Sequence, residues 1–150
     1  VPRLKWIIPH LFVNKTAAFI GDPHLLDGFL DIAEELGLEV EGAIVRGRAA
    51  HGGGVGEGGL ARPGVVHEPP VFSEPARRLL RAPVDLLVSS WFEREERRPA
   101  ARAVMEFGFP SYRHHALYER PFLGFDGFLA FVERMADHLS RPRAPGGEAR

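Results

Sequence analysis

Residues 16–45, TAAFIGDPHLLDGFLDIAEELGLEVEGAIV, decide the fold, because they pass from a strand through a helix to a second strand. The apolar run Thr16–Ile20 predicts the first strand, and Val40–Val45 predicts the second. Between them, apolar side chains recur at helical spacing: Leu25, Leu26, Phe29, Leu30, Ala33 and Leu36. Gly37 is a helix stop signal. A strand-helix-strand crossover of this kind implies parallel strands.

The remaining sequence continues the alternation of strands and helices. Val84–Ser89 predicts a strongly apolar third strand, and Phe109–His114 predicts a fourth. Helices are predicted over Ser73–Leu80 and over Glu93–Phe107, the second of them kinked or split at Pro99. The last helix buries one apolar stripe, made of Phe128, Phe131, Val132, Met135 and Leu139. The predicted fold is α/β, with a small, parallel, doubly wound (Rossmann-like) sheet of about four strands and helices on both faces.

The sequence predicts one domain over residues 14–139, with residues 1–13 as an N-terminal lead-in and 140–150 as a flexible tail. Residues 46–70 are dense in glycine and proline. They bury too little apolar surface to offset the cost of ordering the backbone, so we predict a mobile surface loop. The chain does not begin with Met, and we expect it to be a piece of a longer polypeptide.

Composition limits the classes of function. The 150 residues are 45% hydrophobic and 26% charged, with a formal net charge of −1, which gives no field to attract nucleic acid or an anionic membrane. There is no cysteine, so the chain has neither a disulfide framework nor a thiolate ligand for zinc or an iron-sulfur cluster. No apolar run approaches the roughly 18 residues of a membrane span, and the first residues do not resemble a signal peptide. We therefore expect a cytoplasmic protein.

A glycine motif suggests a nucleotide site, but its context does not. Residues 54–59, GVGEGG, match the GxGxxG pattern, yet they follow the second predicted strand and lead into Pro63 instead of a helix. We interpret them as a glycine-rich linker. At the first strand-to-helix turn, Gly21 supplies the turn, Asp22 the N-cap, and Pro23 lacks a backbone donor. The negative Asp22 also occupies the end of the helix that favours anions, so phosphate binding there is not predicted.

The same turn allows a second interpretation. Cobalamin-binding domains carry Asp-x-His-x-x-Gly after their first strand, with the histidine on cobalt, and Asp22-Pro23-His24 resembles the start of that motif. The glycine comes one position late, because position 27 is Asp27 and the next residue is Gly28. The structural alternative is that Asp22 caps the helix and His24 is exposed on its first turn.

The end of the fourth predicted strand supplies the candidate site residues, which are Ser111, Arg113, His114 and His115. In open α/β sheets, ligands bind at the carboxyl ends of strands. Adjacent residues on an extended chain point to opposite faces, so His114 and His115 are not expected to chelate one metal. One of them is expected to face the crevice, unless it only hydrogen-bonds loop carbonyls. No catalytic residue and no metal ligand is assigned.

Residues 121–128, PFLGFDGF, have a packing explanation. Gly124 and Gly127 allow close backbone approach, and Asp126 is able to cap the final helix. Phe125 and Phe128 are predicted to enter the core.

Residues 15–45, 84–90 (VDLLVSS) and 105–128 (MEFGFPSYRHHALYERPFLGFDGF), followed by the closing helix, resemble the nitrogenase component 1 family. Family members carry a similar helix start, Gly-(Phe/Tyr)-x-Gly-(Phe/Tyr), after a Gly-(Ile/Phe)-Pro strand, and the order and content of these pieces together are fairly specific. The resemblance implies the carboxyl-terminal Rossmann-like domain of an oxidoreductase subunit, one of three such domains. Family members reduce dinitrogen or tetrapyrroles, or act as scaffolds on which a cofactor is assembled.

The resemblance also implies which parts are missing. In molybdenum nitrogenase a histidine just before this motif ligates the cofactor, and Leu123 stands at that position here. The family's cluster-binding cysteines lie in other domains. The resemblance therefore implies a chain that binds no cofactor alone and is not active alone, although the complete protein would hold an iron-sulfur or other metal cluster or a tetrapyrrole. Its partners would be other domains or subunits of the complex.

Three functions stay open at this point. The chain is a domain of a nitrogenase-like reductase that lines a cluster or tetrapyrrole cavity and contacts other subunits, a non-catalytic cofactor-assembly scaffold or carrier, or a cobalamin-binding domain. The sequence also leaves a homo-oligomer open.

Overall fold

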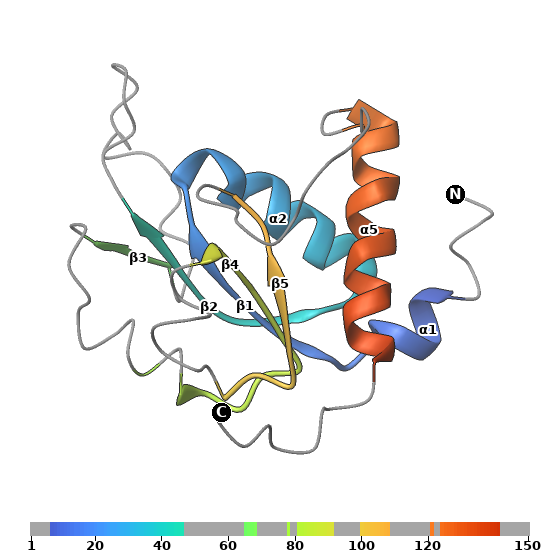
Figure 1. The fold of residues 1–150 in the computed structure, drawn as a ribbon, viewed down its shortest axis with the longest axis horizontal. Coiled ribbons are helices and arrows are strands. Elements are labelled where there is room, and N and C mark those ends of the chain that lie inside the picture. Colours follow the sequence, from blue (N-terminus) through green and yellow to red (C-terminus); the bar gives the residue numbers. More distant parts are fainter. Residues whose placement is uncertain are drawn as a thin grey trace, which may run out of the picture.

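The computed structural model describes residues 7–46, 65–68, 78, 81–91, 100–108, 121 and 124–141. They form a parallel sheet of five strands in the order β3-β2-β1-β4-β5, with helices packed against it (Figure 1). The elements are α1 (Ile7–Leu11), β1 (Thr16–Gly21), α2 (Pro23–Leu36), β2 (Glu39–Arg46), β3 (Val65–Glu68), β4 (Leu86–Ser89), β5 (Ala103–Glu106) and α5 (Gly124–Ser140). The predicted α/β class and parallel, Rossmann-like sheet are confirmed.

Helix α2 begins and ends where its sequence signals predict. Pro23 occupies its first turn, where the missing N–H costs nothing. Gly37 closes it in the left-handed conformation, with φ of 73°. The Gly37 N–H donates to the carbonyl of Glu34 at 3.1 Å, and the Leu38 N–H donates to the carbonyl of Ala33 at 2.9 Å. This pattern satisfies the last carbonyls of the helix.

Two glycines of this region give a test with opposite signs. Gly28→Ala, at an exposed position of α2 with nothing within 4 Å of the added Cβ, is expected to raise the free energy of unfolding by about 0.5–1 kcal/mol. Gly37→Ala is expected to lower it by about 1 kcal/mol, because alanine is strained at positive φ. Urea unfolding of both variants measures the two changes, and equal signs would contradict the assigned end of α2.

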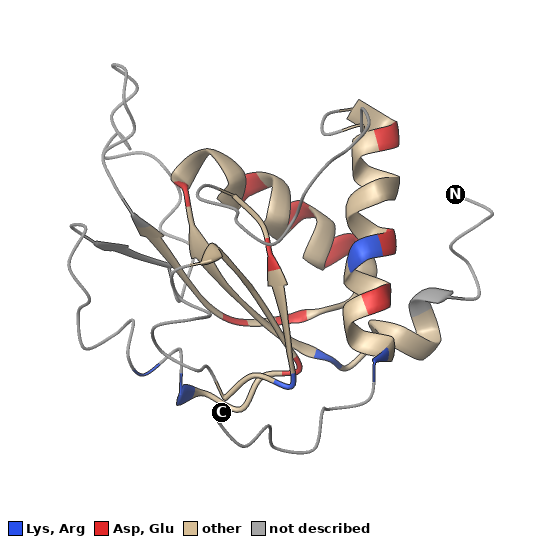
Figure 2. Cartoon of the chain, in the orientation of Figure 1, with Lys and Arg blue, Asp and Glu red and all other residues tan. Residues whose placement is uncertain are grey.

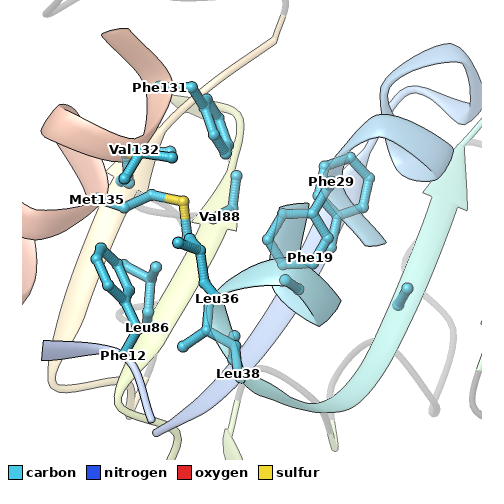
Figure 3. Close-up of a cluster of buried hydrophobic side chains, with 14 of the residues drawn as sticks. Phe12, Phe19, Phe29, Leu36, Leu38, Leu86, Val88, Phe131, Val132 and Met135 are labelled. Carbon is cyan, nitrogen blue, oxygen red and sulfur yellow. The ribbon is translucent and has the colours of Figure 1, made fainter. Parts of the chain in front are cut away.

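The main core lies between one face of the sheet and the two helices α2 and α5. Phe19 of β1 is fully buried and stacks on Phe29 of α2, with ring centroids 5.1 Å apart (Figure 3). Met135 of α5 enters the same cluster from the other side. The opposite face of the sheet is apolar too, and its residues Ala18, Ile20, Ile44, Val84 and Leu87 are at most 3% exposed. Both faces are therefore covered, as a doubly wound sheet requires.

The packed unit includes part of the segment that the sequence analysis assigned to a lead-in. Phe12, directly after α1, is fully buried and belongs to the main core. The Phe12 carbonyl also accepts the Lys15 N–H at 3.0 Å in the turn that leads into β1. The chain from α1 onward is thus held by packing as well as by the turn.

Two sequence predictions about strands are wrong. Residues 65–68 lie in the predicted loop 46–70, yet they form β3 and pair with β2. Residues 103–106 lie in the predicted helix Glu93–Phe107, yet they form β5 and pair with β4. The sheet therefore has five strands instead of about four. The predicted strand Phe109–His114 lies outside the described residues.

Helix α5 buries four residues of its predicted stripe, Phe131, Val132, Met135 and Leu139, and extends beyond the end of β5 (Figure 1). Seventeen helical residues span about 25 Å, whereas the four residues of β5 span about 13 Å. The first turn of α5 accordingly projects past the end of β5 (Figure 1), and Phe125 is 60% exposed instead of buried as predicted. Phe128, one turn later, is half-buried.

The other residues predicted to shape the start of α5 have different roles from those expected. Gly124 has φ of 68° and no atom within 4 Å of an added Cβ, so it provides a backbone conformation and not a close approach. Gly127 is buried. Asp126 lies within the first turn, not before it, where its charge still favours the positive end of the helix.

Asp85, the residue before β4, connects neighbouring strands at the amino-terminal edge of the sheet. Its carboxylate accepts from the Thr16 N–H at 3.2 Å, while its own N–H donates to Oγ1 of Thr16 at 3.1 Å. Lys15 and Arg102 each place a cationic nitrogen 3.8 Å from the same carboxylate. Asp85 therefore connects the starts of β1, β4 and β5.

Asp85→Ala is expected to lower the free energy of unfolding by about 1–2 kcal/mol, because the carboxylate loses two hydrogen bonds, one from the Thr16 N–H and one from the Thr16 hydroxyl. Asp85→Asn keeps an accepting oxygen and loses only the half-exposed ion pairs, so we expect a cost below about 1 kcal/mol. Chemical denaturation in low salt measures both values. An Asn variant as unstable as the Ala variant would show that charge, not hydrogen bonding, joins this edge.

Charges are distributed unevenly over the described surface (Figure 2). The outward face of α2 carries the exposed carboxylates Asp27, Asp31, Glu34 and Glu35, and the helix has no Lys or Arg. That face is unsuited to a phosphate backbone. Within the described part of the chain, no helix has both the length and the apolar character required to cross a bilayer.

Candidate functional site

The strand order reverses between β1 and β4, the two central neighbours of the sheet. β2 and β3 extend the sheet on one side of β1, and β4 and β5 extend it on the other. At such a reversal the connections that follow two adjacent strands diverge, and ligands of open α/β sheets bind in the resulting crevice at the carboxyl ends. The residues to consider are therefore those that follow β1, β4 and β5.

After β1, Gly21 leads directly into the start of α2. An added Cβ on Gly21 would lie 3.0 Å from Cζ of the buried Phe19 ring, so a side chain there would require the ring to shift by a few tenths of an ångström. Asp22 occupies the N-cap position as predicted, in an extended conformation, but its carboxylate makes no capping hydrogen bond. His24 is exposed on the first turn, as in the structural alternative to the cobalamin interpretation.

After β4, the chain places polar groups in the interior. Ser89 is fully buried and Ser90 is 7% exposed, and the Ser89 hydroxyl donates to the Ser90 carbonyl at 3.3 Å. Ser89 is paired in register with Glu106 of β5, which is only 5% exposed. Because paired residues of parallel strands share a face, Ser89 and Glu106 lie on the face opposite Val88 and Met105, which belong to the main core.

These three buried polar residues were missed by the sequence analysis. The signal for the serines was present, since Ser89 and Ser90 end an otherwise apolar strand. No signal marked Glu106, because it lies in the predicted helix Glu93–Phe107, a charged segment. Buried polar groups such as these are the residues that matter most when a site at the carboxyl edge is predicted from sequence.

After β5, the chain passes close to the start of α2. Gly108 has φ of 97°, and an added Cβ would lie 3.4 Å from Cδ1 of Leu25 and 3.7 Å from Oδ2 of Asp22. The exit of β5 therefore lies against the Asp22 carboxylate. Arg134 of α5 donates to the Glu106 carbonyl at 2.6 Å, which connects the last helix to the same edge.

The residues predicted to face the cavity, Ser111, Arg113, His114 and His115, lie outside the described residues. The structure does fix the two ends of the connection that carries them, which leaves the sheet at Gly108 and returns at Gly124. Both glycines have positive φ, of 97° and 68°. Gly108 lies at the carboxyl end of β5, the side of the sheet on which ligands are expected, and the position of the predicted residues stays a prediction.

The donor set at this edge does not suit a metal cluster held by this chain alone. In the described part of the chain, no group of three or more His, Cys, Asp or Glu side chains is placed to hold a metal ion. The whole sequence has no cysteine. Thiolate ligands for an iron-sulfur cluster would have to come from other domains or subunits.

Comparison with known proteins agrees with the fold. The sequence model of the family described as nitrogenase component 1 type oxidoreductase matches residues 7–140. No curated protein matches. Among solved structures, a chain described as "Nitrogenase Cp1 at pH 6.5" is similar with a TM-score of 0.64 and 19% sequence identity, over 92% of this chain and 32% of that chain. Identity this low shows a shared fold, and the present chain spans about a third of the length of that relative.

Proposed function

Since the chain belongs to the nitrogenase component 1 type oxidoreductase family, we propose that it forms one Rossmann-like domain of a reductase component. In this role it lines one wall of a cavity for a metal cluster or a tetrapyrrole and contacts other domains or subunits of the complex. It does not catalyse reduction alone. The family match over residues 7–140 is the observation that carries this proposal.

The carboxyl edge of the sheet supports this role. Asp22 and Gly108 lie close together after β1 and β5, and the predicted donors follow Gly108 in the sequence. This chain's own groups would bind and orient a substrate or cofactor by hydrogen bonds. A bound cluster would supply electron transfer, and its ligands would come from elsewhere because no thiolate is present.

The first test concerns the complex. The complete parent protein, purified anaerobically together with its reductase partner, is expected to contain iron and to show the visible absorption of an iron-sulfur cluster. A preparation without iron would remove the electron-transfer role. Iron and bound tetrapyrrole without turnover would instead favour the assembly scaffold.

The second test concerns this chain. If the chain is instead a scaffold or carrier that holds a tetrapyrrole by itself, titration with iron protoporphyrin, followed by absorption, is expected to saturate, and His114→Ala or His115→Ala is expected to weaken the affinity about tenfold, which equals about 1.4 kcal/mol. His10→Ala is the matched control, because His10 is exposed on α1. Equal affinities in all four proteins would contradict the carrier alternative. A spectral shift with cobalamin that His24→Ala abolishes would favour the cobalamin domain.

A further inference from the structure

Three successive residues at the exit of β5 are held by side chains of two different helices. The carbonyl of Glu106 accepts a hydrogen bond from the Arg134 guanidinium at 2.6 Å, and the same guanidinium lies 6.0 Å from the centroid of the Phe107 ring. The bond is short and its donor is ionised, which makes it stronger and more directional than a bond between neutral groups. Arg134 therefore contacts both the backbone and the ring of this turn.

The ring of Phe107 is held on a second side by α5. Phe131 meets it edge-on, with centroids 4.6 Å apart and an angle of 66° between the planes. Phe131 is 7% exposed and belongs to the main core. Because Phe131 and Arg134 are three residues apart on one helix, they lie on the same face of α5 and contact Phe107 together.

Gly108, the next residue, is limited by α2. Its φ of 97° is one that other residues rarely adopt, and an added Cβ would be in van der Waals contact with Leu25 and Asp22. The exit of β5 thus lies between the last helix and the start of the first long one. A shift of α5 along its axis would move the Glu106 carbonyl and the Phe107 ring with it.

The geometry points to Arg134 as a positioning residue for the carboxyl edge. It fixes the exit of β5 relative to α5, and so sets where the chain leaves the sheet at Gly108. This inference rests on the proposed function only for its consequence, the binding of a cofactor at that edge. The positioning itself is a property of the described residues.

Amide hydrogen exchange of the whole chain, followed by NMR, tests the positioning. The Phe107 N–H is a suitable reporter, because it donates to the Ser89 carbonyl at 2.8 Å across the strand ends. Arg134→Met is expected to raise its exchange rate at least about tenfold while the β1 and β2 amides keep theirs, since local opening and global unfolding are separate processes. Arg134→Lys, which keeps a cationic donor, is expected to restore part of the protection. Glu133→Gln, next to it and exposed, is the control.

The outcomes separate positioning from general stabilisation and from the proposed function. An unchanged Phe107 rate in Arg134→Met, or an equal rise in the β1 and β2 amides, would overturn the inference. The iron content of the complete parent protein tests the proposed function separately. If Arg134→Met exposes the Phe107 amide while the parent protein contains no iron, the positioning holds and the proposed reductase role fails.

Discussion

Phe19→Ala is expected to lower the free energy of unfolding by about 3–5 kcal/mol, the range for removing a buried aromatic ring. Phe19 is fully buried on β1, the strand that pairs with both β2 and β4. Its ring stacks on Phe29, so the substitution also leaves a cavity beside a second ring that is 2% exposed. Small domains are stable by only about 5–15 kcal/mol, so this variant is expected to be largely unfolded at moderate urea concentration.

Urea titration followed by circular dichroism measures the change, and Phe125→Ala is its control. The control makes the same substitution at a ring that is 60% exposed, and we expect a change within about 0.5 kcal/mol. A loss below about 1 kcal/mol for Phe19→Ala would mean that the stacked pair is not part of a close-packed core. A large loss of unfolding free energy for Phe125→Ala would mean that the Phe125 ring is buried and not exposed.

The parts of the fold that could be predicted are those in which local sequence and tertiary packing agree. The segment from β1 through α2 to β2 has two apolar strands, a helical stripe and Gly37 as a stop signal, and each of these features points to the same structure. The stripe on α5 was predicted for the same reason. Phe125 shows where periodicity fails, because a repeat along a helix does not say how far the sheet beneath it extends.

Strand β5 could not be predicted from its own residues. Ala103, Met105 and Glu106 are good helix formers and follow a charged stretch, so local propensity favours a helix. The strand exists because it pairs with β4 and places Met105, which is fully buried, in the main core. The prediction for β3 was wrong for a different reason. Its four residues lie in a segment rich in glycine, which predicted a loop, and they form a strand because they pair along the edge of β2.

For the candidate site, the sequence predicted a location at the carboxyl edge and four residues that lie outside the described part of the chain. The carboxyl edge follows from any parallel sheet, but the buried pair Ser89 and Glu106 depends on the register between β4 and β5, which no local pattern contains. The proximity of Asp22 and Gly108 likewise joins residues far apart in the sequence. Contacts of this kind require the strand order, and the strand order depends on tertiary packing.

Met135→Ala is expected to lower the free energy of unfolding by about 2–5 kcal/mol. Met135 is fully buried, and Figure 3 shows its side chain pointing from α5 into the cluster with Val88 and Leu36. Its loss removes contacts that join α5 to the sheet and to α2 together. Met135→Leu keeps nearly the same volume and is expected to cost less than about 1.5 kcal/mol, so the pair separates the cavity from the chemistry of the sulfur.

The same variant decides whether α5 belongs to the cooperative unit formed by β1, α2 and β2. If it does, urea unfolding of Met135→Ala is expected to remain one transition with an unchanged slope and a lower midpoint. Circular dichroism and tryptophan fluorescence would then give the same midpoint. An early separate loss of helical signal would instead show that α5 unfolds on its own, and Arg134 could not then hold the exit of β5 in place. The predictions for Met135 and Arg134 therefore hold or fail together, because both require that α5 stays packed against the sheet.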